Sequence, residues 1–410
     1  MRPPPLSLRQ VQQSVLDTDS VLLEFALGED RSFVCALSST SYTVHELPSR
    51  SAIEQEVHRL HAHLTARLTV AGTLQDRRRR AADADLRYWE SAETLSRVLL
   101  GNLAPSLSGK RVVVAPDGVL QFVPFAALPD PASPGEHVPL VVNHEICMLP
   151  SASALAVHRR VTAGRRPPAG GVVVLADPVF EPDDPRLRAV RRGGRASGAA
   201  APRPGLQPEG GGSGAPRISR LAATRAEADA IAAAAGPGGS FLRFGFDASR
   251  AVATGGDLSD YRIVHFAAHG ILDDVNPGLS GIMLSLFSAA GEPVDGFLRL
   301  RDIYELDLPA ELVVLSACST ALGRQVKGEG LVGIVRGFMY AGAKRVVASL
   351  WKVDDEATGE LMRRFYVGVF RDGLSHAAAL RRAQLELRQQ RRWQAPYYWA
   401  AFTLQGDWQR

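Results

Sequence analysis

A histidine and a cysteine each follow a strongly apolar run in the second half of the chain. His269 ends the strand-like run YRIVHFAAHG, residues 261–270, and Cys318 follows the apolar part of ELVVLSACSTALG, residues 311–323. A free thiol has a pKa near 8.5, so a neighbouring imidazole is needed to make it a thiolate nucleophile at neutral pH. The thiolate would attack a peptide carbonyl, and the imidazolium would protonate the leaving amine. The pair therefore indicates a cysteine peptidase, with Cys318 as nucleophile and His269 as base.

Glycines accompany both residues. The tetrahedral intermediate of such a reaction needs backbone N–H donors, and Gly270 allows the chain after the histidine to approach a substrate closely. We expect the amides of Gly270 and Cys318 to form this oxyanion hole. Gly328 and Gly330 follow in a loop that lacks the Gly-Lys-Ser/Thr ending of a phosphate loop, so we interpret them as part of a flexible segment beside the nucleophile.

The elements that must position this pair alternate between strand and helix. Apolar runs predict strands at 261–268, 281–286, 311–317, 345–350 and 402–404. Helical periodicity predicts helices at 221–235, 331–342, 355–370 and 375–390, with Asp355 and Ser375 as N-caps. This alternation predicts an α/β layered fold around a mainly parallel sheet flanked by helices. Ligands bind at the carboxyl ends of parallel strands, so both candidate residues lie where a site is expected.

The first part of the chain has a different pattern. We predict a hairpin of residues 21–27 and 32–37, a third strand at 42–47, and helices at 51–70 and 83–100. The run Arg77–Arg80 between these helices is expected to be a solvated helix end or loop. Further strands are expected at 112–115, 120–123 and 171–176, and a helix near 152–160. We therefore divide the chain into an N-terminal α+β region, 1–105, and a second domain, 106–410. The second domain carries a Gly-, Pro- and Arg-rich insertion at 181–217, which is expected to be disordered.

Composition narrows the classes of function. The 410 residues are 46% hydrophobic with a net charge of only +4, which favours a globular protein and gives little support to nucleic-acid binding. The three cysteines, Cys35, Cys147 and Cys318, are far apart, which argues against a disulfide framework and for a reducing cytoplasm. Apolar runs are too short for a signal peptide or a membrane span.

Several segments together resemble one family. The segments HFAAHG, LSACSTALG, GEGLVGIVRGFMYAGAKRVVASLWKVDDEAT and APYYWAAFTLQGD are similar to the CHAT peptidase family, which is related to caspases and separases. Two earlier segments, VVVAPDGVLQFVPFAAL and LAATRAEADAI, extend the resemblance over about residues 108–409. It implies a caspase-like fold, a His269–Cys318 dyad, and peptide hydrolysis with no cofactor and no metal. Ser319 stands where this family commonly has an acidic residue.

The resemblance also suggests a specificity pocket. The segment LWKVDD, residues 350–355, is similar to a separase segment whose carboxylates recognise a basic residue before the cut. Asp354 and Asp355 are thus candidates to bind Arg or Lys through a charge-assisted pair, although Asp355 could serve only as a helix cap. Trp351 is a candidate for the wall of the substrate cleft, with burial in the core as the alternative.

The partners implied are a protein substrate and a regulatory or sensor protein, with no direct nucleic-acid or membrane contact. By analogy with the family, the setting would be a bacterial one, in defence or regulated proteolysis. The alternative function is a non-catalytic, caspase-like scaffold. A second histidine, His265, shares a strand face with His269, but a metal site there lacks an evident fourth ligand. We therefore expect His265 to be a hydrogen-bonded structural residue beneath the site.

Overall fold

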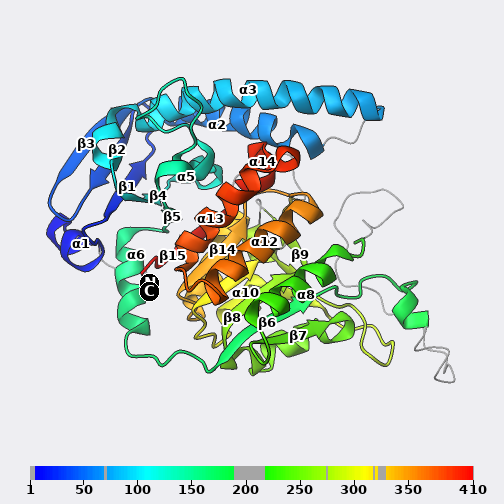
Figure 1. Ribbon diagram of the computed structural model, residues 1–410. Coiled ribbons are helices and arrows are strands. Elements are labelled where there is room, and N and C mark those ends of the chain that lie inside the picture. Colours follow the sequence, from blue (N-terminus) through cyan, green and yellow to red (C-terminus); the bar gives the residue numbers. More distant parts are fainter. Residues whose placement is uncertain are drawn as a thin grey trace.

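The protein is described by a computed structural model that covers residues 5–68, 72–188, 218–273, 276–316, 319–321 and 329–409. Within these ranges one continuous sheet of eleven strands runs through the molecule (Figure 1). Its strands, in spatial order, are β3 (Tyr42–Leu47), β2 (Ser32–Leu37), β1 (Ser20–Ala26), β4 (Arg111–Ala115), β5 (Ile146–Met148), β15 (Phe402–Gly406), β14 (Arg345–Ser349), β12 (Leu312–Leu315), β8 (Tyr261–Ala267), β6 (Gly170–Ala176) and β7 (Ser240–Phe244).

Most neighbouring strands of this sheet are parallel. The antiparallel pairs are the N-terminal β1–β2–β3 meander and β14–β15, and every other pair runs parallel. All residues of β12 and β14 are buried, as is usual for parallel strands that are covered on both faces. A smaller sheet of four strands lies beyond the ends of β8 and β12. It consists of β11 (Phe297–Arg299), β10 (Gly281–Met283), β9 (His269–Leu272) and β13 (Ser319–Ala321).

Helices cover the sheet, and α12 packs against both α8 and α13 in a layer in front of it (Figure 1). The helices are α1 (Leu8–Ser14), α2 (Arg50–Thr65), α3 (Leu74–Leu100), α4 (Ala104–Leu107), α5 (Leu140–Asn143), α6 (Ala152–Thr162), α8 (Ala223–Ala235), α9 (Arg250–Thr254), α10 (Leu300–Tyr304), α11 (Glu329–Tyr340), α12 (Asp355–Phe370), α13 (His376–Arg388) and α14 (Pro396–Trp399). None of the helices described is long and apolar enough to cross a bilayer.

The α/β architecture and its mainly parallel sheet are as predicted, and so are the N-terminal hairpin and its third strand. The hairpin continues the main sheet, because β1 pairs in parallel with β4. The boundary near residue 105 stays a prediction.

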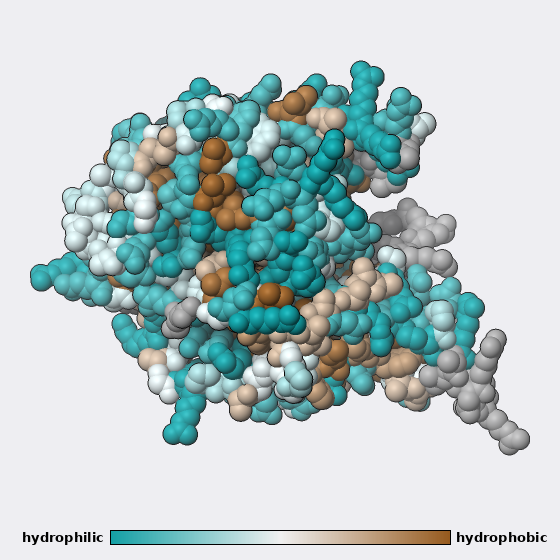
Figure 2. Space-filling view, viewed as in Figure 1, coloured by the Kyte–Doolittle hydropathy of each residue, from teal (hydrophilic) through white to brown (hydrophobic). Residues whose placement is uncertain are grey.

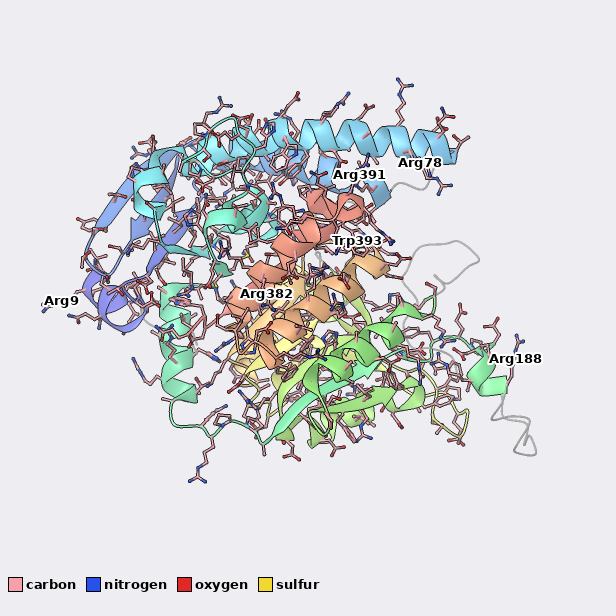
Figure 3. All side chains as sticks on the ribbon, in the orientation of Figure 1. Arg9, Arg78, Arg188, Arg382, Arg391 and Trp393 are labelled. Carbon is pink, nitrogen blue, oxygen red and sulfur yellow. The ribbon has the colours of Figure 1, made fainter. Side chains whose placement is uncertain are left out.

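Two local expectations were wrong. Residues 120–122 belong to a 3₁₀ turn, Gly118–Phe122, which Val123 caps, and the next residue, Pro124, has no N–H for a sheet ladder. The helix predicted at 83–100 begins at Leu74, because Thr73 and Asp76 form a capping box and the arginines that follow favour helix. Arg77–Arg80 therefore lies in the first turns of α3, where the surface is hydrophilic, and Arg78 marks this end of the helix (Figures 2 and 3). This is the solvated helix end that was one of the two alternatives expected for the run.

The insertion expected at 181–217 is partly packed. Residues 181–188 are described, and Leu187 among them is fully buried. Asp184 in the same segment binds Arg186, which also donates to the carbonyl of Asp177 at 2.7 Å. The remainder, 189–217, lies outside the described residues.

Candidate active site

The strands that lead to His269 and Cys318 are direct neighbours. β8 and β12 pair in parallel, with His265 opposite Val314, and the amide of Ser316 donates to the carbonyl of Phe266 at 3.0 Å. Ala317 and Cys318 themselves lie outside the described residues. The chain is described again at β13, where the parallel ladder pairs Ser319 with Gly270.

This register bears directly on the predicted dyad. The residue that follows His269 is the ladder partner of the residue that follows Cys318. The chain on either side of the nucleophile position therefore runs alongside the chain that carries the histidine. Gly270 is paired on both sides, with Ser319 and with Ile282 of β10, and the oxyanion hole at Gly270 and Cys318 stays a prediction.

His269 is half-buried at the start of β9, and its ring has a defined orientation. Nε2 lies 2.8 Å from the carbonyl oxygen of Ser219. A carbonyl only accepts hydrogen bonds, so Nε2 must carry the proton in this contact. In the neutral ring Nδ1 is then left with a lone pair that can accept a proton. The ring of Phe180 packs against the imidazole, with centroids 5.2 Å apart.

The surroundings of His269 lower its pKa. Burial is the main cause, because it disfavours the imidazolium, and the charge of Lys352 acts in the same direction. The Ser219 carbonyl and the carboxylate of Asp355 oppose this shift. The imidazole is thus neutral at pH 7, which is the state that a general base requires. These electrostatic contacts also show that the segment carrying Lys352 and Asp355 lies close to His269.

A cluster of buried polar side chains lies behind the ends of β8 and β12. Nδ1 of His265 lies 3.0 Å from the Tyr366 hydroxyl, and the Ser316 hydroxyl donates to Oε1 of Glu227 at 2.7 Å. The same Oε1 lies 3.1 Å from Nε2 of His265, but the two atoms are not aligned for a hydrogen bond. His265 is fully buried and has the hydrogen-bonded structural role that was expected of it.

A hollow of about 330 Å³ opens between the N-terminal helices and the segment that precedes α12. Its lining residues are Arg67, Lys352, Val353, Asp354, Asp355, Tyr397 and Tyr398. Two of its lining residues, Lys352 and Asp355, carry charges that act on His269. Both candidate specificity carboxylates line this hollow.

The carboxylates of Asp354 and Asp355, which both line the hollow, have different structural roles. Asp354, not Asp355, is the N-cap of α12, and its Oδ1 accepts from the amides of Glu356 and Ala357. The expectation that Asp355 caps this helix was wrong, because Asp354 has the extended backbone that the N-cap position requires. Burial raises the pKa of Asp355, while the neighbouring charge of Lys352 lowers it.

Trp351 lies in the core and not on the wall of this hollow. Its side chain is buried, 3% exposed, and its indole N–H donates to the carbonyl of Tyr397 at 3.0 Å. We therefore no longer assign it a contact with substrate. Through this hydrogen bond Trp351 supports Tyr397, which does line the hollow.

Sequence reasoning missed the contribution of the N-terminal region. The guanidinium of Arg67 lies over the rings of Tyr397 and Tyr398, 5.9 and 5.3 Å from their centroids, and it also pairs with Asp85. The sequence around Arg67 contains no local pattern that predicts its contact with Tyr397 and Tyr398. Ser219 and Glu227 were missed for the same reason.

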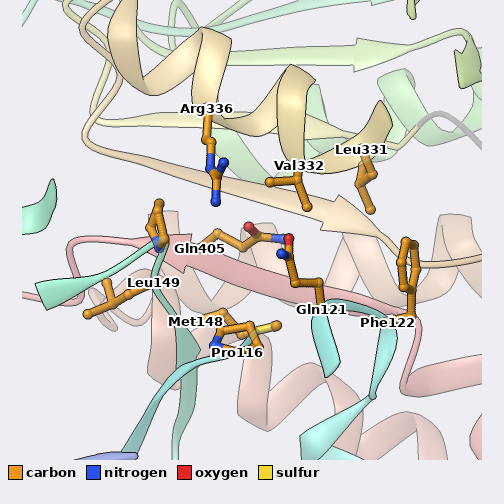
Figure 4. A pocket seen from close by; sticks show the side chains of 10 residues that line it. Pro116, Gln121, Phe122, Met148, Leu149, Leu331, Val332, Arg336 and Gln405 are labelled. Carbon is orange, nitrogen blue, oxygen red and sulfur yellow. The ribbon is translucent and has the colours of Figure 1, made fainter. Parts of the chain in front are cut away.

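A second small hollow lies among α11, β5 and β15, and His269 does not line it (Figure 4). Arg336, Gln121 and Gln405 project toward it. Its volume is only about 10 Å³, close to the minimum for a single water, so it offers no room for a peptide side chain.

Comparison with known proteins identifies the family of this chain. The model of the CHAT domain family matches residues 89–407. The chain belongs to the CHAT domain family. In the curated proteins, "Tetratricopeptide repeat protein 28" of Mus musculus is 36% identical over 110 residues, 27% of this chain, and its Homo sapiens counterpart is 34% identical over the same length. The chain covers only 4% of either protein.

The solved structures show the same fold in separase. Two structures of the Saccharomyces cerevisiae separase–securin complex align with 97% of this CHAT chain, at TM-scores of 0.59 and 0.56. Sequence identity is 10% and 11%, and 30% and 31% of those chains are covered. The caspase-like fold that the resemblance implied is thereby confirmed.

Proposed function

We propose that this CHAT protein is a cysteine endopeptidase that cleaves a protein partner through Cys318 and His269. The observation that carries the proposal is the parallel register that pairs Ser319 with Gly270, since it aligns the chain after each member of the dyad. A second support for the proposal is the hydrogen bond from Nε2 of His269 to the Ser219 carbonyl. This bond holds the ring proton on Nε2, so Nδ1 can accept a proton.

Apart from a water molecule in its second half, the proposed chemistry uses only groups of this chain and of the substrate. His269 takes the thiol proton of Cys318, and the thiolate sulfur attacks the scissile carbonyl to form a tetrahedral oxyanion. The C–N bond then breaks as the imidazolium donates its proton to the leaving amine, which leaves an acyl-enzyme thioester. Water deprotonated by His269 hydrolyses the thioester, and the thiol is restored. Backbone amides at Gly270 and Cys318 are our candidates for stabilising the oxyanion.

The hollow beside His269 supports a preference for a basic residue before the cut. Asp354 and Asp355 would bind the guanidinium or ammonium of that residue by charge-assisted hydrogen bonds. The positive charge of Arg67 is already engaged by Asp85 and by the faces of Tyr397 and Tyr398. We further propose a reducing, cytoplasmic setting, which the separated cysteines favour, and a regulatory protein partner.

The test compares the wild type with Cys318→Ala, with circular dichroism as the control for folding. A peptide library is incubated with each under reducing conditions, and the products are identified by mass spectrometry. We expect cleavage after Arg or Lys by the wild type only. A peptide electrophile should label the wild type at Cys318 and leave Cys35 and Cys147 unmodified; burial raises the pKa of both these thiols, that of Cys147 to about 12. An unreactive Cys318 in the folded, partner-bound protein would instead favour a scaffold.

A further inference from the structure

The segment after β6 contacts the surroundings of His269 in two independent ways. Phe180 packs against the imidazole ring, and Asp177, three positions earlier, binds Arg220. The Asp177–Arg220 contact is bidentate, with Nε to Oδ1 and Nη2 to Oδ2 both at 2.7 Å. Arg220 directly follows Ser219, whose carbonyl accepts the hydrogen bond from His269.

Asp177 has an unfavourable backbone conformation and a buried side chain. Its side chain is fully buried, and its φ of 50° lies in the left-handed region, which is uncommon for a residue with a side chain. Its amide donates to Thr224 Oγ1 in the first turn of α8, so the backbone of Asp177 is also fixed. A strained backbone of this kind persists only where its surroundings hold it, and such sites gather near functional residues.

We propose that the Asp177–Arg220 pair is the positioning device for the base: it holds the Ser219 carbonyl against Nε2 and so fixes the orientation of the His269 imidazole. A bidentate pair fixes the guanidinium in two directions, which a single contact cannot do. With Ser219 held, the ring keeps its proton on Nε2 and presents Nδ1 as the acceptor. The proposal deepens the function given above, because the imidazole that it orients is the proposed base.

The decisive variant is the double substitution Asp177→Asn with Arg220→Gln. It removes both members of the pair without changing the net charge beside His269, and it leaves Lys352 and Asp355, the charged groups that act on the imidazole, in place. Loss of the Ser219 contact lowers the pKa of His269, because that hydrogen bond favours the imidazolium. Each single variant breaks the same pair, so each should shift the His269 pKa in the same direction as the double substitution does.

The matched control is Asp407→Asn. Asp407 forms an equally bidentate pair with Arg159, at 3.0 and 2.7 Å, which joins α6 to the C-terminal segment and makes no contact with His269. Its loss should cost stability of the same order as the loss of the Asp177 pair, and it should leave the His269 imidazole unchanged.

The readout is ¹⁵N NMR of labelled histidine, with the His269 signals among the ten histidines assigned by their absence in His269→Gln. In the folded double variant we expect a lower pKa for His269 and a smaller excess of the Nε2–H tautomer over the Nδ1–H tautomer. With a cleavable peptide, kcat should fall by roughly tenfold with little change in KM.

An unchanged pKa and tautomer in the folded double variant would overturn the proposal. Should Asp177→Asn prevent folding, Arg220→Gln alone serves, because the Arg220 side chain is 41% exposed. The NMR readout does not need a reactive Cys318. A shifted tautomer in a protein without peptidase activity would therefore support the positioning device and count against the proposed function.

Discussion

The carboxylate of Glu227 accepts a hydrogen bond from the hydroxyl of Ser316 at 2.7 Å, in the interior of the protein. Ser316 directly follows β12, two positions before the proposed nucleophile. The same carboxylate oxygen lies 3.1 Å from Nε2 of His265 in β8, the strand that leads to His269. One side chain from α8 thus contacts both strands that carry the candidate dyad, and it is 4% exposed.

We expect Glu227→Ala to destabilise the fold by roughly 3 kcal/mol, because it leaves the Ser316 hydroxyl buried without an acceptor and His265 without its neighbouring carboxylate. Glu227→Gln keeps an oxygen that can accept from Ser316, so its cost should be about 1 kcal/mol. Urea unfolding followed by tryptophan fluorescence measures both. Equal losses of unfolding free energy in the two variants would show that the negative charge of Glu227 stabilises the fold and that the hydrogen bond from Ser316 does not.

The role of Asp354 as a helix cap can be separated from its proposed role in the specificity pocket. Asp354→Ala removes the acceptor for two amides at the start of α12 and should cost about 1 kcal/mol of stability. Asp354→Asn keeps a capping oxygen and should leave stability nearly unchanged. Both variants remove the charge, so both should lower kcat/KM for peptides with Arg before the cut.

The control for Asp354 is a substrate pair that differs only in that residue, Arg against norleucine. A pocket role predicts that the preference for Arg shrinks to the same extent in Asp354→Ala and Asp354→Asn. If the preference survives in Asp354→Asn, the carboxylate acts only as a helix cap.

His376 gives the fold a component of stability that depends on pH. Burial, and then the charge of Arg345, lower its pKa from 6.5 to about 3, and Nη1 of Arg345 lies 2.9 Å from its Nδ1. The folded state therefore binds this proton more weakly than the unfolded state. The stability is fully present above pH 6.5 and is lost as the pH falls toward 3, at up to about 1.4 kcal/mol per pH unit.

His376→Gln should lack this component, because an amide does not titrate. Urea unfolding between pH 7.5 and 4.5 should show a shallower loss of stability in this variant than in the wild type. Identical pH slopes in the two proteins would contradict the assignment to His376.

Local patterns in the sequence were sufficient for the strands that carry the site. The apolar runs before His269 and Cys318 predicted β8 and β12, and the parallel sheet follows from their alternation with helices. The early start of α3 was also legible, since Thr73 and Asp76 have the spacing of a capping box. It was missed because the arginines after it were interpreted as a break between helices.

Contacts between distant segments left no such local signal. Arg67 reaches Tyr397 and Tyr398 only because the N-terminal helices pack against the segment around α14. Ser219 meets His269 because the chain returns to this edge of the sheet before α8. Every residue has a backbone carbonyl, so the types of the side chains could not have identified the Ser219 carbonyl as the acceptor.

The charges around His269 predict how peptidase activity depends on pH. Its pKa is lowered, chiefly by burial, so the acidic limb of kcat/KM should lie below pH 6.5. Lys352 is one cause of this lowering, and Lys352→Ala should move the limb to higher pH. Asp355 acts in the opposite direction, and Asp355→Asn should move the limb to lower pH.

The opposite signs of these two shifts are what make the test specific to His269. Lys110→Ala removes a lysine whose ammonium donates to the carbonyl of Thr18 and whose charge is not among those that act on His269, so it should leave the limb in place. A general change in surface charge would move the limb in Lys110→Ala as it does in Lys352→Ala. Shifts of the same sign in Lys352→Ala and Asp355→Asn would show that the limb belongs to a group other than His269, and the assignment of the base would fail.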